Sequence, residues 1–410
     1  MSETNELRIA VIGAGPAGVY SSDIFLRQLG KLGEELGLGT KARIDLFEKL
    51  PVPFGLVRYG VAPDHPSIKF IASALEKTLD NPDIHLYCDV EFGKDVTLDE
   101  LLERYDAVLF ATGAVEDKPL GLPGADLDGV YGAAKFVEWY DGYPTGAREW
   151  PLDAEEVAVI GGGNVAMDVT RSSIRLGADK VTCVYRRRQA DMTALPDEIT
   201  GALAEGAELM TLAAPVRIEA DEDGAAKALW VQPQIIGEVD KAGRPRPGKA
   251  ALDEVRIPAD VIVVAIGQGV EIQGFDQAGV PIQRGAFVAG LSGQVRDMDS
   301  VFAGGDCVTG PATAIRAIAA GKVAAANIDE HLGFRHEITV DVEIPSPKLN
   351  NSPPHGRIDT TEREACERKH DFEDIECGLT QEGACAEAGR CLRCDHFGYG
   401  IFRGGRNEKW

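Results

Sequence analysis

Two glycine-rich turns constrain the fold of this chain more than any other feature. Residues 13–18 (GAGPAG) directly follow the apolar run Leu7–Ile12, and a helical pattern continues from them to about Leu29. Residues 161–166 (GGGNVA) follow the apolar run Val157–Ile160 in the same way. A strand, a G-x-G-x-x-G/A turn and a helix in this order are typical of a dinucleotide-binding unit. The pattern predicts two dinucleotide sites, unless one turn is only a structural echo of the other.

Both turns carry small residues where a pyrophosphate needs room. Gly13 makes the first turn, Gly15 admits the pyrophosphate, and Gly18 packs the helix on the strand, while the helix N-terminus faces the phosphates. The residues expected to contact the cofactors are Gly13, Gly15, Ala17 and Gly18 in the first turn, and Gly161, Gly163, Asn164 and Val165 in the second.

The stretch 48–66 combines the geometry of a loop with the composition of a core. Its four prolines and two glycines exclude a regular helix or central strand, yet Leu, Val, Phe and Tyr fill the remaining positions. Glu48 ends a predicted strand, where a carboxylate can hold a ribose diol, and Gly55-Leu56 lets the backbone approach a flat ring. His65 can carry a proton near neutral pH. We interpret the stretch as a cofactor-lining loop rather than a structural, proline-rich one.

The next strand of the second unit, Val181–Tyr185, ends at Arg186 and Arg187. An acidic residue at this position would favour NAD by holding the ribose 2′-hydroxyl, whereas arginines suit the 2′-phosphate of NADP. The pair therefore predicts a preference for NADPH. A solvated basic turn is the alternative interpretation.

The first turn and the 48–66 loop resemble the adrenodoxin reductase family, flavoproteins that pass electrons from NADPH to a small iron–sulfur protein. This resemblance runs from about Leu7 to Arg171. Beyond Arg171 the chain is similar to the small (beta) subunit of glutamate synthase, whose last flavin motif looks like residues 300–306 (SVFAGGD) and the glycine and threonine that follow. The resemblance implies FAD at the first turn and NADPH at the second.

The resemblance also implies roles for single residues. His65 and Asp168 match a histidine and an aspartate that lie near the flavin and the nicotinamide, and Asp306 would bond the ribityl chain. A loop histidine with its hydrogen bonds satisfied and an acid stabilised by a helix dipole are the structural alternatives for the first two. The other residues assigned to cofactor binding are Val90, Glu198, Gly310 and Thr313.

The expected fold class is α/β, with two interleaved dinucleotide-binding, Rossmann-like domains and a C-terminal cysteine-containing extension. The expected bounds are 1–115 and 270–334 for the FAD domain, 116–269 for the NADPH domain, and 335–410 for a linker and tail. The 410 residues, 44% of them apolar and 47 of them glycine, suit such a protein. Gly18 and Glu48 are 30 residues apart, more than the usual spacing of about 20, which indicates a loop insertion around Gly30–Thr40.

The net charge of −24 argues against nucleic acid and against anionic membrane surfaces as partners. No apolar run approaches the roughly 20 residues that a spanning helix needs. The polar residues 1–6 lead directly into a strand, so we expect no signal peptide and a cytoplasmic protein.

Five of the eight cysteines lie in the last 45 residues. The run 371–394 looks like the start of the iron–sulfur domain of the glutamate synthase small subunit, but the second half of its cysteine pattern is missing. Cys391 and Cys394 have the spacing of cluster ligands, which leaves a cluster contact open. Cys385 lies on a predicted helix, where it is either a further ligand or a packed small hydrophobe. Basic and aromatic side chains in 391–410 predict a docking site for a partner.

Three functions remain open at this level. The first is a free-standing NADPH–ferredoxin reductase. The second is the flavin subunit of a larger iron–sulfur oxidoreductase, joined through its tail. The third, a thiol–disulfide reductase using Cys391 and Cys394, is disfavoured because neither nucleotide domain holds a C-x-x-C pair. A scaffold without turnover is disfavoured too, because both cofactor motifs are intact.

Overall fold

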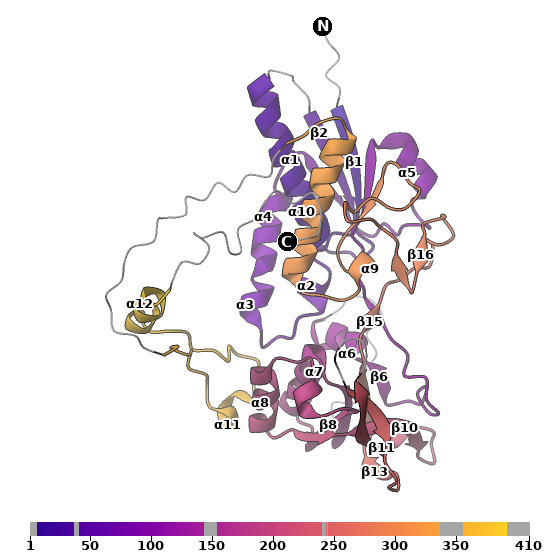
Figure 1. Cartoon of the computed structure of the whole chain (residues 1–410), viewed down its shortest axis with the longest axis vertical. Helices are drawn as coiled ribbons and strands as arrows, with labels where there is room; N and C mark the ends of the chain where they lie inside the picture. Colours follow the sequence, from indigo (N-terminus) through magenta and orange to yellow (C-terminus); the bar gives the residue numbers. More distant parts are fainter. Residues whose placement is uncertain are drawn as a thin grey trace.

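The computed structural model describes residues 6–36, 41–142, 154–239, 243, 245–336 and 356–391. It has two lobes, each built on a five-stranded sheet (Figure 1). The first lobe, at the top of the figure, unites strands from the beginning of the chain with a strand near residue 300. The second lobe lies between these segments in the sequence. This arrangement confirms the α/β class with two interleaved dinucleotide-binding folds, whereas the exact domain bounds stay predictions.

The sheet of the first lobe is parallel throughout, in the order β18-β4-β1-β2-β3. Central strands β1 and β4 bury their apolar side chains, as in a parallel sheet covered by helices on both faces. Its strands are β1 Glu6–Ile12, β2 Lys41–Phe47, β3 Ile84–Tyr87, β4 Ala107–Phe110 and β18 Val301–Ala303. Its helices are α1 Pro16–Leu36, α4 Ile71–Leu79, α5 Leu98–Arg104, α9 Asp306–Thr309 and α10 Ala314–His331, and a small ribbon pairs β16 Ile282–Gln283 with β17 Ala286–Phe287.

The second lobe repeats the parallel arrangement in the order β6-β14-β7-β8-β9. A curved antiparallel sheet, β10 to β13, extends from its far end (Figure 1). The parallel strands are β6 Val130–Gly132, β7 Glu156–Gly161, β8 Lys180–Tyr185, β9 Glu208–Thr211 and β14 Val261–Ala265. The antiparallel strands are β10 Ala213–Ala220, β11 Ala226–Val239, β12 Pro245–Lys249 and β13 Val255–Pro258, and the helices are α6 Ala133–Tyr140, α7 Asn164–Arg175, the short η1 Gln189–Asp191 and α8 Pro196–Glu205.

A two-stranded antiparallel ribbon joins the lobes. It pairs β5, Glu116–Asp117, with β15, Gln268–Gly269, so that the two crossings of the chain run side by side. The Asp117 carboxylate also accepts hydrogen bonds from the backbone N–H groups of Ala134 and Lys135 at the start of α6. The ribbon is thereby tied to the second lobe.

Close packing explains several small residues of the first turn. A side chain at Gly18 would place its Cβ 2.0 Å from the carbonyl oxygen of Gly13, so the turn tolerates no methyl group there. A Cβ at Gly321 of α10 would lie 2.6 Å from the carbonyl oxygen of Ala17 on α1. Helices α1 and α10 therefore approach closely because both contribute small residues at the crossing, and Ala17 serves this packing.

One predicted element differs from the structure. The expected loop insertion around Gly30–Thr40 is wrong as far as Leu36, because α1 continues to that residue, where Lys, Leu and Glu favour a helix despite the glycines. The segment after the 48–66 loop forms two helices, α3, Pro66–Lys69, and then α4, with Phe70 between them. The 48–66 loop is irregular except for one helical turn, α2, Leu56–Tyr59.

The C-terminal segment 356–391 contains two short helices. Helix α11, Ala365–Arg368, contacts α8 of the second lobe, whereas α12, Gln381–Gly389, stands away from both lobes (Figure 1). The side chain of Thr380 caps α12 by accepting a hydrogen bond from the backbone of Gly383. Among the helices that the structure describes, none combines the length and apolar character needed to cross a bilayer.

Candidate functional site

The side chain of Glu48 lies against the first glycine turn. Its side chain accepts hydrogen bonds from the backbone N–H groups of Ala14 at 2.9 Å and Leu50 at 3.0 Å. Burial raises the pKa of this carboxyl above its usual value, against the lowering effect of these two donors. Because a carboxylate can accept more than two hydrogen bonds, Glu48 is fixed in place and still suited to hold a ribose diol.

Space for a pyrophosphate is present at Gly15. A Cβ built on this residue meets no atom within 4 Å, in contrast to its crowded neighbours Gly13 and Gly18. Gly55 from the 48–66 loop faces it, because a Cβ on Gly55 would lie 3.8 Å from the Gly15 Cα. Gly55 has a φ of 48°, which favours glycine. The loop and the turn thus form one cradle that fits a dinucleotide.

The remaining residues assigned to FAD are Val90, Asp306, Gly310 and Thr313. Val90 donates its backbone N–H to the carbonyl oxygen of Glu48 at 3.0 Å. Asp306 is raised in pKa by burial, and its Oδ1 atom has no hydrogen-bond partner in the described part of the chain. A buried acceptor of this kind suits the hydroxyl groups of a ribityl chain. Gly310 has a φ of 77°, and the exposed Thr313 caps α10 by accepting a hydrogen bond from the backbone N–H of Arg316.

The second glycine turn has the same design as the first. A Cβ on Gly161 would lie 2.3 Å from the carbonyl oxygen of Ala265, and one on Gly162 would strike the ring of Tyr185. Gly163 is less crowded, with the nearest atom, of Thr193, at 3.4 Å. The Asn164 side chain is exposed and accepts a hydrogen bond from the backbone of Leu195, and Val165 is half-buried beside it.

The three arginines after β8 differ in their contacts. Arg188 is engaged in a two-pronged ion pair with Asp191. Arg187 is half-buried and donates from Nε to the carbonyl oxygen of Pro245. Arg186 is exposed, and no ion pair is found for it among the described residues. The two residues predicted to bind a 2′-phosphate are therefore those whose charges are not already neutralised by a carboxylate.

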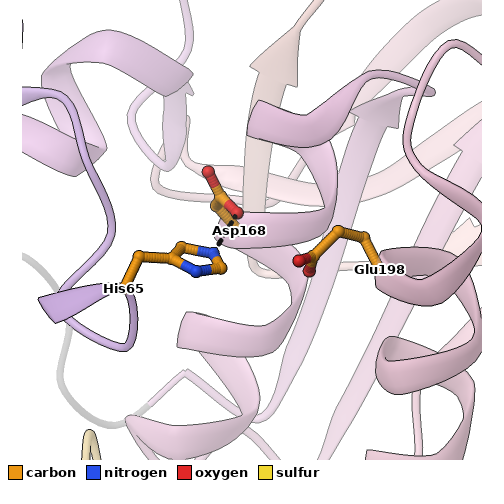
Figure 2. Close-up of side chains that lie close together, drawn as sticks. All are labelled: His65, Asp168 and Glu198. Atoms are coloured by element: carbon orange, nitrogen blue, oxygen red, sulfur yellow. Dashed lines mark hydrogen bonds and ion pairs between the residues drawn. The ribbon is translucent and has the colours of Figure 1, made fainter. Parts of the chain in front are cut away.

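Three titratable side chains meet where the two lobes touch (Figure 2). His65, at the end of the 48–66 loop, places Nε2 at 3.4 Å from Oδ1 of Asp168 on α7. Glu198 on α8 completes the group. A ring nitrogen of the histidine and one carboxylate oxygen of each acid all lie within 4.8 Å of one another. The Glu198 carboxylate is held by Arg171 at 2.6 Å. The structure thus brings together His65 and Asp168, which the sequence assigned to the reactive end of the site, and Glu198, which it assigned to cofactor binding.

The hydrogen bond to Asp168 raises the pKa of His65 above its ordinary 6.5, against the opposing effect of burial. The charges of Asp64 and Glu198 act in the same direction. His65 therefore holds its proton more tightly in the folded protein than a free imidazole does, and its hydrogen bond to Asp168 spans the contact between the lobes.

We expect the stabilising effect of His65 to depend on pH. A raised folded-state pKa means that the contribution is fully present below pH 6.5 and is lost as the pH rises through the folded-state value. His65→Gln should therefore lower the thermal midpoint below pH 6.5, at a cost of about 1 kcal/mol, and have little effect well above it. Scanning calorimetry of both proteins across this range checks the prediction, and a constant difference at every pH would contradict it.

Sequence reasoning missed the buried charges that support this group. Asp64, next to His65, and Arg175 form an ion pair at 3.3 Å with both side chains almost fully buried. Arg171 and Arg175 are four residues apart and share one face of α7. Two arginines four residues apart on the helix predicted after the second turn were the signal from which these buried charges could have been anticipated.

The cysteine predictions have mixed outcomes. Cys385 lies on a helix as expected, but its side chain is exposed, so the interpretation as a packed small hydrophobe is wrong. Cys391 is exposed and free. Cys394 and the aromatic and basic residues after it lie outside the described residues, so the cluster contact and the docking surface stay predictions.

Comparison with known sequences gives a family match. Residues 7–321 match the profile of the family described as pyridine nucleotide-disulphide oxidoreductase. The glutamate synthase [NADPH] small chain of Halomonas elongata is 31% identical over 79% of this chain and 68% of its own. The mitochondrial NADPH:adrenodoxin oxidoreductase of Drosophila melanogaster is 44% identical over 42% of this chain and 34% of its own. Both resemblances seen in the sequence are confirmed.

A relative that matches almost the whole of this chain is itself longer than the chain. The NADP(+)-dependent formate dehydrogenase subunit beta of Moorella thermoacetica is 33% identical over 98% of this chain and 56% of its own. The chain spans about half the length of the first curated relatives that it matches. Among solved structures, the Mycobacterium tuberculosis oxidoreductase FprA aligns with a TM-score of 0.69 and 25% identity, over 80% of this chain and 85% of its own.

Proposed function

The chain belongs to the pyridine nucleotide-disulphide oxidoreductase family, and on this basis we propose that it is an FAD-containing oxidoreductase that transfers electrons between NADPH and an iron–sulfur protein of the ferredoxin type. The family relation brings with it an FAD- and NADPH-binding fold. The resemblance to adrenodoxin reductase supports the iron–sulfur acceptor, and the names of two relatives include NADPH.

The contact between His65 and Asp168 carries the proposal. His65 ends the loop that begins at Glu48 in the candidate FAD site, and Asp168 lies in the second turn of the helix that begins at the candidate NADPH site. Their 3.4 Å approach brings the ends of the two cofactor sites together. Direct transfer between two bound dinucleotides needs this proximity.

Each part of the site has a proposed task. The glycine cradle and Glu48 bind FAD, and Asp306 orients its ribityl chain. The second turn and the two arginines after β8 bind NADPH. His65, protonated and paired with Asp168, supplies a positive charge and a proton donor where the two rings meet. When bound, FAD provides a ring that accepts hydride from NADPH and releases electrons singly.

The purified protein should be yellow and release FAD on heating. Anaerobic NADPH should bleach the flavin absorbance, and addition of an oxidised ferredoxin should restore it. NADH should act much more slowly. A colourless protein that takes up no FAD would refute the proposal, and a flavin that NADPH fails to reduce would refute its catalytic part.

A second candidate function is the flavin subunit of a larger iron–sulfur oxidoreductase. The coverage of the Moorella thermoacetica subunit beta over 98% of this chain favours it. Purification from the native source under gentle conditions separates the two functions. A stable complex with an iron–sulfur protein supports the subunit, and an isolated chain that reduces free ferredoxin supports the independent reductase. In either case we propose a cytoplasmic location, which suits the seven free cysteines of the described residues.

The partner is proposed to dock on residues 391–410. Truncation after Gly389 should leave FAD content and NADPH-driven reduction of ferricyanide unchanged, while reduction of the protein acceptor falls at least tenfold. The cut spares the described contacts of α11 with the second lobe. Loss of flavin or precipitation of the truncated chain would show that the tail belongs to the fold, and unchanged acceptor reduction would place docking elsewhere.

A further inference from the structure

Glu205, the last residue of α8, is the centre of a buried cluster of charges. Its carboxylate has no exposure to solvent and contacts three guanidinium groups: Arg171 at 2.6 Å, Arg175 at 3.1 Å and Arg368 at 2.9 Å. Arg171 and Arg175 belong to α7, whereas Arg368 belongs to α11 of the C-terminal segment. We call these four residues the Glu205 hub. One carboxylate does not balance three cations, so further anions are required.

Each arginine of the hub also reaches an outer carboxylate. Arg171 binds Glu198, Arg175 binds Asp64, and Arg368 binds Glu362. Two of these outer carboxylates lie beside His65. The Asp64 carboxylate is 4.0 Å from His65 Nε2, and Glu198 belongs to the group of three in Figure 2. The hub therefore has two arms that end at the reactive site and one that ends in the C-terminal segment.

The attachment of the C-terminal segment at this point is unusually well buried for a charged residue. Arg368 is 4% exposed, and its carbonyl oxygen accepts a hydrogen bond from Nε of Arg175 at 3.2 Å. The ring of Phe372 lies 5.9 Å from the guanidinium carbon of Arg175, as a cation–π neighbour. Arginine is almost never fully buried unless it is paired. A segment that only covered the surface of the second lobe would not need to bury a cation between two helices of that lobe.

We propose that Arg368 is a positioning residue for the reactive site: through the Glu205 hub it holds the carboxylates of Glu198 and Asp64 in place beside His65. Without Arg368, the two arginines of α7 are drawn more strongly to Glu205 and away from the outer carboxylates. Those carboxylates then act on His65 with less compensation. The inference rests on the proposed function for the importance of His65, whereas the electrostatic coupling itself is measurable without turnover.

The sign of the effect follows from the charges around His65. The groups that act on it are the carboxylates of Asp168, Asp64 and Glu198. Behind them, Arg171 pairs with Glu198 and Arg175 with Asp64, and the Tyr140 hydroxyl is coupled electrostatically to Asp168 and Asp64. Removing the positive charge of Arg368 makes this environment more negative and should raise the pKa of His65. Removing the negative charge of Glu205 frees the α7 arginines for the outer carboxylates and should lower it.

The test is an NMR titration of the flavin-loaded protein labelled with carbon-13 at the ring of its seven histidines. His65→Gln identifies the resonance of His65. Arg368→Gln should move its pKa upward and Glu205→Gln should move it downward, each by about half a unit. Arg368→Lys keeps the charge and should restore a value close to that of the parent. The matched control is Arg363→Gln, because the Arg363 side chain pairs with Asp371 inside the same segment, whereas its contact with the hub is made by the backbone carbonyl, which accepts from Arg368 and is kept by the substitution.

Opposite shifts in the two variants support the proposal, because general loosening of the structure would move both in one direction. Shifts of the same sign, or an unchanged His65 in folded variants, overturn it. If Arg368→Gln does not fold, Glu205→Gln decides alone by the presence or absence of the downward shift. A protein that shows these shifts but is not reduced by NADPH would refute the proposed function and leave the coupling intact.

Discussion

Gly15→Ala is expected to yield a folded protein that has lost its FAD. The structure has room for the added methyl group, because nothing lies within 4 Å of a Cβ at this position and its φ is not in the left-handed region. The room is the space that we assign to the pyrophosphate, so the methyl group and the cofactor compete for it. Overpacking of this kind costs about 1–3 kcal/mol, which corresponds to a loss of FAD affinity of roughly fivefold to more than a hundredfold.

The measurement is the ratio of flavin to protein after purification, followed by titration of the apoprotein with FAD. Two other glycines serve as controls. Gly18→Ala should destabilise the fold itself, because its Cβ would lie 2.0 Å from a carbonyl oxygen, while Gly356→Ala, in open space in the C-terminal segment, should change neither property. An FAD affinity of Gly15→Ala equal to that of the parent would show that the pyrophosphate does not lie at this turn.

Replacement of Arg186 and Arg187 by alanine is expected to remove the preference for NADPH. Charge-assisted hydrogen bonds to a phosphate contribute about 1.5–3 kcal/mol each, so the double variant should bind NADPH at least a hundredfold more weakly. Binding of NADH should remain nearly unchanged, because it has no 2′-phosphate. Rapid-mixing measurement of flavin reduction at varied nucleotide concentrations gives both constants.

Arg188→Ala is the matched control for this pair. Its guanidinium is already paired with Asp191, so its loss should alter the NADPH constant little. A large effect of Arg188→Ala alone, or equal use of NADPH and NADH by the parent protein, would contradict the assignment of the 2′-phosphate site.

The parts of the fold that follow from local chemistry were predictable from the sequence. The two glycine turns could be identified from the sequence alone, because the flanking apolar strands specify their context. The structure adds the physical reason for the glycines, which is that the crowding at Gly18 and Gly161 admits no side chain. The approach of His65 to Asp168 was different. These residues are 103 positions apart, and no periodicity relates them, so only the family resemblance indicated that they would meet.

The charged support of the site was not predictable in the same way. Glu205 ends a helix and Arg368 follows a charged run, and both patterns are typical of solvent-exposed positions. Their burial depends on α7 and α8 meeting α11, whose Arg368 lies 163 positions from Glu205 in the sequence. The length of α1 was misjudged because the excess spacing between Gly18 and Glu48 was assigned to a loop, whereas helix-forming residues continue the helix to Leu36.

The ribbon of β5 and β15 has a consequence for how the protein folds during its synthesis on the ribosome. Because the second lobe is enclosed between two adjacent strands, residues 116–269 form a contiguous stretch that can fold as soon as it has been synthesised. The first lobe cannot complete its sheet until β18, Val301–Ala303, has emerged, and it lacks Asp306 and α10 until later still. The first lobe is thus begun first and completed last. The nascent chain can fold the second, nucleotide-binding lobe before its flavin site is complete.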